Sequence, residues 1–394
     1  MRFAGIDIAA ETHVVTLVNE ASQVLVPPTP FGEDAAGYHA LRTLLGGPED
    51  LLVAMEATGH YWQNLFAVLA AEGFAVALLN PVRTRRFAGE DLARAKTDAI
   101  DAIGIARFAA QKRPAITRLP DAATQELREL VRLRDRLRQE FGDRVRQLHR
   151  LVDLGFPEFT RLVPDLKGRL ATALLAAYPT ARAFAGMSVA RLAAVRYDGV
   201  HRVGADLARA LLAAAKESVG QHHGPAYQRQ VRYLCEDLEL LQRRIDALED
   251  DVATTLKAHE VGTLLTTITG IGVQTAARLV GELGDPAGFR SAAALAAYVG
   301  VVPGTRESGK RRLTHARLAP TGHARLRAAL WMPTLVAVRT NPWLRAYYER
   351  LRARGKLPKV ALIAALHKLL FAVYSVAKHR RPFVPYLIVQ GVQA

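Results

Sequence analysis

The sequence predicts an α/β domain at the amino-terminal end, followed by an all-α remainder. Three observations support this fold class. Short apolar strands alternate with helical segments over the first 120 residues. From residue 121 to about 260, apolar residues recur at steps of three and four, which is the helical period. The rest of the chain is helical in pattern and strongly basic. We therefore expect three parts, covering residues 1–120, 121–260 and 261–394.

Strand and helix patterns alternate throughout the first part. Apolar runs bounded by Gly, Pro, Asn and Asp indicate strands, and longer amphipathic runs indicate helices. The expected strands cover residues 3–9, 13–17, 24–26, 51–55 and 75–79. The expected helices cover residues 35–45, 61–72 and 98–111. We expect the third strand to end at Pro27-Pro28, because proline lacks a backbone donor.

The middle part contains two long amphipathic helices with near-heptad apolar spacing. The first repeat consists of Leu130, Leu137, Phe141, Val145, Leu148 and Val152. The second consists of Val231, Leu234, Leu238, Leu241, Ile245, Leu248 and Val252. This spacing favours a coiled-coil hairpin that also helps the chain to dimerise. The alternative is that the two helices pack within one globular domain. Residues 155–225 between them read as helices broken by Gly and Pro.

Charge is concentrated in the last third of the chain. The net charge is +16, and residues 261–394 hold 20 Lys and Arg against 4 Asp and Glu. The corresponding counts are 11 and 13 for residues 1–120, and 22 and 20 for residues 121–260. A generally basic proteome would raise the charge everywhere. The concentration therefore favours binding of a nucleic-acid backbone.

Other composition features exclude several classes of protein. With Cys235 as the single cysteine, neither a disulfide framework nor a cysteine zinc site can form, which favours a reducing cytoplasm. The chain opens directly into an expected strand, so we expect no signal peptide. Charges interrupt the apolar stretches, so we expect no membrane-spanning helix.

Four acidic residues stand in positions that favour metal binding. Asp7 lies inside an apolar strand, and Glu56 ends another. Burying a carboxylate in such a setting is unfavourable unless it has a partner. Asp98 and Asp101 are three residues apart, which places them on one helix face; the alternative is that they are solvated helix acids. Four oxygen ligands suit Mg²⁺ or Mn²⁺, and such ions assist phosphodiester cleavage.

The basic third contains two candidate phosphate-binding motifs. Gly270 and Gly272 precede an apolar helix, as in a helix–hairpin–helix, where backbone N–H groups approach a phosphate. The alternative is a glycine turn between packed helices. Ser308 lies in a glycine-bounded basic segment. The residues alone favour a phosphate-contacting serine over a nucleophile. The cations of this segment are Arg306, Lys310, Arg311 and Arg312.

These motifs together resemble the DEDD-type insertion-sequence transposases, the bridge-RNA-guided recombinases. The resemblance rests on Gly5-Ile6-Asp7, on Glu56-Ala57-Thr58-Gly59 and on the Lys96 to Asp101 motif, with Tyr298-Val299-Gly300 and Ser308-Gly309 in the last third. The resemblance spans most of the chain. The middle part matches only in being helical, and the stretch between the two catalytic halves is longer than in the family.

The resemblance has specific implications. It implies a RuvC-like domain of ribonuclease-H fold, with Asp7, Glu56, Asp98 and Asp101 as metal ligands. It implies that Ser308 attacks DNA and forms a covalent phosphoserine link. It also implies a structured guide RNA that pairs with donor and target DNA, and a homo-oligomer, dimer or tetramer, whose protomers share a composite site.

Two other functions remain open on the residues alone. A metal-dependent nuclease of the junction-resolvase type would use water and form no covalent link. A DNA-binding scaffold without enzymatic activity would use its acids for structure only. Trapping a protein–DNA adduct separates the first alternative from the recombinase. A thermal shift with Mg²⁺ that is lost on removing Asp7 argues against the second.

Overall fold

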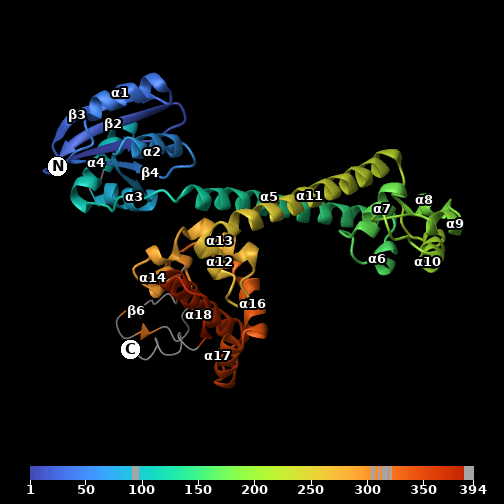
Figure 1. The fold of residues 1–394 in the computed structure, drawn as a ribbon. Helices are drawn as coiled ribbons and strands as arrows, with labels where there is room; N and C mark the ends of the chain where they lie inside the picture. Colours follow the sequence, from blue (N-terminus) through green and yellow to red (C-terminus); the bar gives the residue numbers. More distant parts are fainter. Residues whose placement is uncertain (91–96, 303–306, 309–310, 313–317, 319–321, 386–394) are drawn as a thin grey trace. The chain divides into compact units, whose positions relative to one another are not determined.

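The computed structural model describes residues 1–90, 97–302, 307–308, 311–312, 318 and 322–385, with the backbone alone at 88–90, 307–308 and 311–312. The described chain forms two compact units, Met1–Leu119 and Pro120–Ala394, which we treat separately. Unit 1 is α/β, and unit 2 is almost entirely helical (Figure 1). A mixed first domain followed by a mostly helical remainder agrees with the predicted fold class. The finer division at residue 260 stays a prediction.

Unit 1 is built on a five-stranded mixed sheet. The strand order is β3-β2-β1-β4-β5, with β1, β2 and β3 antiparallel and β1, β4 and β5 parallel. This order agrees with the ribonuclease-H-like fold that the resemblance implies. The strands are β1 (Arg2–Asp7), β2 (Thr12–Asn19), β3 (Val24–Gly32), β4 (Leu51–Glu56) and β5 (Ala75–Leu79).

The third strand corrects one expectation. We expected it to end at Pro27-Pro28, but β3 continues through both prolines to Gly32. It lies at the edge of the sheet and pairs only with β2, with register shifts along the pair. An edge strand tolerates proline because half of its backbone groups need no partner in the sheet.

Helices cover both faces of this sheet. The helices are α1 (Ala35–Leu45) and α2 (Trp62–Ala71) on one face, and α3 (Pro81–Glu90) and α4 (Asp98–Lys112) on the other. Alternate side chains of each strand point to opposite faces. In β1, Ala4 and Ile6 join the core under α1 and α2, whereas Phe3 joins the core under α4.

Helix α4 crosses β1 in direct contact with Gly5. A Cβ atom on Gly5 would lie 2.3 Å from both the carbonyl oxygen of Ala102 and the backbone nitrogen of Ala106. Arg113, which follows α4, forms an ion pair at 3.4 Å with Glu20. Glu20 follows Asn19, which pairs with Arg2 at the start of β1. The helix therefore runs antiparallel to β1, and its first turn lies at the carboxyl end of that strand.

Unit 2 contains a long antiparallel helical pair, α5 (Ala122–Gly155) and α11 (Pro225–Lys257). Ion pairs cross between the helices, from Arg134 to Glu249 and from Arg144 to Asp237. The second apolar repeat is buried throughout within the chain. The two helices therefore pack against each other within one chain, and dimerisation through them stays a prediction.

Short helices close the far end of this pair around a core of their own (Figure 1). They are α6 (Phe159–Leu162), α7 (Arg169–Ala177), α8 (Ala181–Ala185), α9 (Val189–Ala193) and α10 (Ala205–Lys216). The core includes three mutually contacting rings of Phe156, Phe159 and Phe184. This matches the broken helical pattern expected for residues 155–225.

The carboxyl-terminal helices pack against the other end of the pair, around a separate core. The elements are α12 (Glu260–Leu265), α13 (Val273–Leu283), η1 (Pro286–Gly288), α14 (Ala292–Val299), β6 (Glu307–Ser308), β7 (Arg311–Arg312), α15 (Ala324–Ala329), α16 (Trp331–Thr340), α17 (Pro342–Ala353) and α18 (Pro358–His379). Contrary to the expectation of no candidate membrane span, α18 is long and apolar enough to cross one. Its most apolar stretch is 61% buried in this core, as a core helix of a globular unit would be.

The contact at Gly5 generates a prediction about stability. Gly5→Ala should destabilise unit 1 by about 1–3 kcal/mol, because the new methyl group overlaps the backbone of α4. Chemical denaturation of the full chain measures the change. Gly104→Ala is the matched control, since that position in α4 has no atom within 4 Å of the new Cβ. Parental stability of the Gly5 variant would show that α4 does not depend on this contact.

Candidate active site

Asp7 and Glu56 lie side by side at the carboxyl ends of two parallel strands. Ile6 pairs with Met55, so the following residues in β1 and β4 are neighbours. Strand alternation places both acids on the face covered by α4, because Phe3, Leu52 and Ala54 belong to that core. Both side chains are half-buried. The apolar strands thus carry two carboxylates to one position on one face.

Glu56 has a partner that sequence analysis did not identify. The buried hydroxyl of Thr84, in α3, donates a hydrogen bond to Glu56 Oε1. Helix α3 begins at Pro81, directly after β5, which pairs with β4 as far as Glu56. Thr84 therefore orients the carboxylate from the neighbouring strand connection. A threonine in a polar helix has no pattern that would have predicted this contact.

The two helical acids belong to the first turn of α4. Thr97 caps the helix, accepting a hydrogen bond from the backbone of Ile100 at 3.3 Å. Acids in a first turn interact favourably with the helix dipole. Asp101 is half-buried and immediately precedes Ala102, which lies over Gly5, whereas Asp98 is exposed.

Asp7, Glu56, Asp98 and Asp101 therefore lie at one edge of the sheet, which we call the acidic edge. Asp7 and Glu56 end two neighbouring strands, and Asp98 and Asp101 lie in the first turn of α4. Within the described part of the chain, no three His, Cys, Asp or Glu side chains are close enough to hold a metal ion as they stand. Their assignment as ligands therefore stays a prediction that the topology supports.

A buried histidine supports the backbone after Asp7. His13 is fully buried in β2; its Nδ1 accepts a hydrogen bond from the backbone of Ala9 at 3.2 Å, and its Nε2 lies 2.7 Å from Glu33 Oε2. Burial alone would raise the pKa of the Glu33 carboxyl, but hydrogen bonds outweigh burial and lower that pKa. The donors are Tyr38, His13 and Asn64. Sequence analysis missed this network because its members are separated along the chain.

The structure places only part of the predicted basic site. Ser308 in β6 pairs antiparallel with Arg311 in β7, which also contains Arg312. Arg306 and Lys310 lie outside the described residues. Gly270 has a φ of +102°, and a Cβ there would lie 2.5 Å from Cβ of Ala337.

Packing against α16 therefore explains Gly270 without a ligand. Gly272, by contrast, is exposed at the start of α13, with no atom within 4 Å of a Cβ placed there. Of the two glycines, Gly272 is therefore the one that stays a candidate for phosphate contact.

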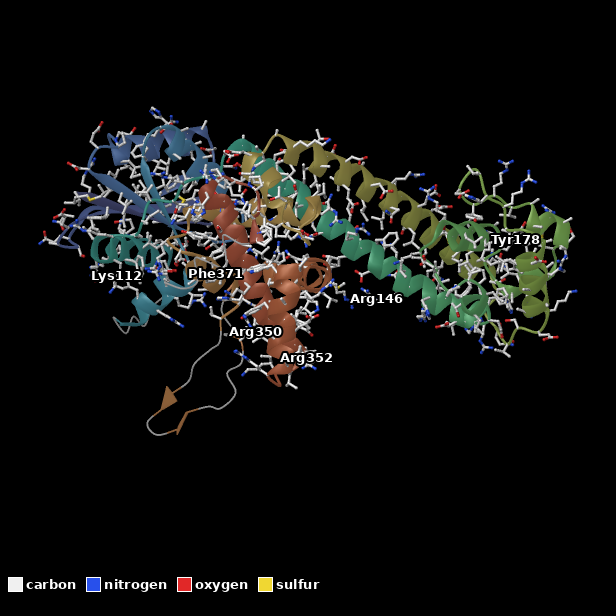
Figure 2. The ribbon with its side chains drawn as sticks, turned by 60° about the horizontal axis from the view of Figure 1, so that its bottom comes forward. Lys112, Arg146, Tyr178, Arg350, Arg352 and Phe371 are labelled. Atoms are coloured by element: carbon white, nitrogen blue, oxygen red, sulfur yellow. The ribbon has the colours of Figure 1, made fainter. Side chains whose placement is uncertain are left out.

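A basic surface that sequence analysis did not single out lies on α17 and the start of α18. Its exposed cations have no ion pair with any acid among the described residues. Figure 2 shows two of them, Arg350 and Arg352, on this helical hairpin. The guanidinium of Arg350 also lies 5.4 Å from the ring centre of Tyr347. We call this set the basic hairpin: Arg345, Arg350, Arg352, Arg354, Lys356 and Lys359.

The mixed sheet with helices on both faces is consistent with a ribonuclease-H-like domain of a nucleic-acid-processing enzyme. Comparison with known proteins specifies the class further. Residues 4–157 match the DEDD-type IS110 transposases. Residues 262–349 match the family described as transposase IS116/IS110/IS902.

Similar proteins cover most of the chain. An IS110 protein of 43.6 kDa from Streptomyces coelicolor is 30% identical over 311 residues, 78% of this chain and 76% of that protein. An IS116 protein of 44.8 kDa from Streptomyces clavuligerus is 27% identical, covering 97% and 96%. The pilin gene-inverting protein of Moraxella bovis is 25% identical, covering 84% and 82%. The chain belongs to the IS110/IS116 family of transposases and is an enzyme of DNA transposition and recombination.

The contact between Thr84 and Glu56 generates a prediction. Thr84→Val keeps the volume but removes the hydroxyl, so Glu56 loses its orienting partner. We expect DNA strand cleavage about 10-fold slower or more, as for other residues that orient metal ligands. Thr84→Ser, which keeps the hydroxyl, is the matched control and should retain most of the activity. Equal loss in both variants would assign the effect to packing.

Proposed function

We propose that the protein exchanges DNA strands through a metal-assisted reaction in which Ser308 becomes covalently linked to DNA. The observation that supports this proposal is the acidic edge, where two acids end adjacent parallel strands and two more lie in the first turn of the helix that covers the same face. Membership of a transposase family supplies the reaction class.

The residues of the acidic edge fit Mg²⁺ or Mn²⁺ in their chemistry. All four offer carboxylate oxygens, the ligands that these ions prefer. We propose Asp7, Glu56, Asp98 and Asp101 as the residues that would hold the metal. When bound, it would supply positive charge that favours formation of the attacking oxygen and stabilises the leaving one. The contacts of Thr84 and His13 hold the strand ends in place for this role.

The proposed serine step is balanced in bonds and protons. The Ser308 oxygen forms a bond to phosphorus while one phosphorus–oxygen bond of the DNA backbone breaks. The serine proton leaves to solvent or a base, and the released strand end takes up a proton as a hydroxyl. Attack by a hydroxyl of another strand reverses the step and frees the serine. One phosphodiester is exchanged for another, so no external energy source is required.

The basic carboxyl-terminal region is proposed to hold nucleic acid. Exposed, unpaired cations on the basic hairpin favour backbone phosphates, and the accessible start of α13 at Gly272 offers backbone donors. Arg306, Lys310, Arg311 and Arg312 would surround the phosphate near Ser308. We further propose a cytoplasmic homo-oligomer that uses a guide RNA with donor and target DNA. Sequencing the nucleic acid that copurifies with the protein tests the RNA.

A comparison of two variants tests the proposed nucleophile. On a suicide DNA substrate, Ser308→Ala should abolish both the covalent adduct and recombination while DNA binding persists, because only one hydroxyl is lost. Asp7→Ala should also abolish cleavage, because it removes a proposed metal ligand. The adduct is measured by denaturing electrophoresis and its linkage is mapped by mass spectrometry.

The rival reaction makes the opposite prediction. A nuclease that uses water would still nick DNA as the Ser308→Ala variant with Mg²⁺, and neither variant nor parent would form an adduct. Nicking by this variant without any adduct would overturn the serine assignment and leave the acidic edge standing.

Salt dependence tests the basic hairpin. Replacing Arg350, Arg352 and Arg354 with alanine should lower the slope of log affinity against log salt by up to about 3, because each lost phosphate contact removes roughly 0.9. The control is a triple alanine variant of exposed arginines that already have acidic partners, Arg146, Arg209 and Arg243. If both triple variants change the slope equally, the hairpin has no special role.

A further inference from the structure

We propose that Glu282 and His323 are positioning residues that hold the base of the Ser308-containing segment against helix α5. The segment comprises residues 301–321, and we call it the serine segment. This inference rests on the proposed role of Ser308 as nucleophile. Its evidence is separate, because it comes from described residues on either side of the segment. We call Arg132, Glu282 and His323 the Glu282 cluster.

A buried carboxylate lies at the centre of the cluster. Glu282 is in α13, and its side chain is 5% exposed. Arg132 of α5 binds it with two parallel hydrogen bonds, from Nε to Oε1 at 3.0 Å and from Nη2 to Oε2 at 2.9 Å. Burial alone would raise the pKa of Glu282, but the bonds from Arg132 and the charges of Arg132, His323 and Arg325 lower it. Glu282 is therefore a buried anion with fixed geometry.

His323 links this anion to the end of the serine segment. Its Nε2 lies 3.3 Å from Glu282 Oε2. Its Nδ1 accepts a hydrogen bond at 3.1 Å from the backbone N–H of Leu326, which caps α15. Because Nδ1 accepts, the neutral ring carries its proton on Nε2, the nitrogen that lies beside the carboxylate. His323 therefore contacts the start of α15 through one ring nitrogen and lies beside the Glu282 carboxylate with the other, as a positioning residue would.

The two ends of the serine segment meet beside His323. The backbone N–H of His323 donates to the carbonyl of Tyr298 at 2.8 Å. Gly322, with a φ of +106°, approaches Gly300 so closely that a Cβ on Gly322 would lie 2.5 Å from the Gly300 Cα. The segment therefore leaves and re-enters the helical core at one point, and the Glu282 cluster holds that point to α5.

This arrangement gives the cluster a role in the reaction. An attacking group must stay within a fraction of an ångström of its productive position, and residues far from the chemistry can control that position. Backbone contacts join the two ends of the serine segment to each other, and the charges of the Glu282 cluster connect them to α5. Loss of the Nε2 contact should therefore slow attack by Ser308 while DNA affinity, which comes from other cations, is retained.

The test uses His323→Asn in the full chain. Asparagine is a good helix-capping residue, so α15 keeps its cap while the contact with Glu282 is lost. The matched control is His259→Asn. His259 caps α12 through Nδ1, and its Nε2 lies 3.0 Å from the Thr124 hydroxyl of α5, so it is an equivalent histidine elsewhere in unit 2. Two readouts are measured: the single-turnover rate of adduct formation on a suicide DNA substrate, and hydrogen exchange of backbone amides in residues 301–321.

We expect His323→Asn to form the adduct about 10- to 100-fold more slowly at unchanged DNA affinity, with faster exchange in the serine segment. His259→Asn should match the parent in both readouts. Parental exchange in the His323 variant, or equal changes in both variants, would overturn the inference. If the parent forms no adduct, the serine role fails, and the exchange readout still decides whether the cluster holds the segment.

Discussion

The contact between Gly5 and the backbone of α4 is the constraint on which the arrangement of unit 1 depends. Gly5 has no side chain, so α4 lies directly on β1 at Ala102 and Ala106. The same helix carries Asp101 immediately before Ala102 and Asp98 one turn before Ala102, and β1 ends two residues after Gly5, at Asp7. A larger residue at position 5 would separate the helical pair of acids from the strand pair. The glycine therefore sets the spacing of the acidic edge.

The second unit depends on charge pairing as well as on apolar packing. Helix α5 carries a row of arginines, and several reach the carboxyl-terminal helices: Arg128 donates to the carbonyl of Gly281 at 2.6 Å, and Arg132 binds Glu282. The same helix packs against α11, with ion pairs between the two helices. Because the proposed serine and the proposed metal ligands belong to different compact units, strand exchange requires both units, from one chain or from two, to act on the same DNA.

The sequence predicted those features that depend on local pattern. Helix α1 and strand β5 match their expected bounds, and Glu56 ends its strand, whereas β1 ends at Asp7 and not at residue 9 as expected. Features that depend on tertiary contacts were missed. The pair of Arg132 and Glu282 joins residues 150 positions apart, and β3 continues through prolines because it is an edge strand. The heptad pattern predicted both long helices. It did not show that they pack against each other within one chain, because this depends on how helices α6 to α10 connect them.

The central claim is that the acidic edge binds the metal that assists strand cleavage. Anomalous diffraction from crystals grown with Mn²⁺ and DNA tests it most directly. The account predicts a Mn²⁺ peak in direct contact with carboxylate oxygens of Asp7 and Glu56, at about 2 Å as for similar hard cations, with Asp98 or Asp101 completing the ligands. Mn²⁺ bound elsewhere, or at the edge without either helical acid, would contradict it.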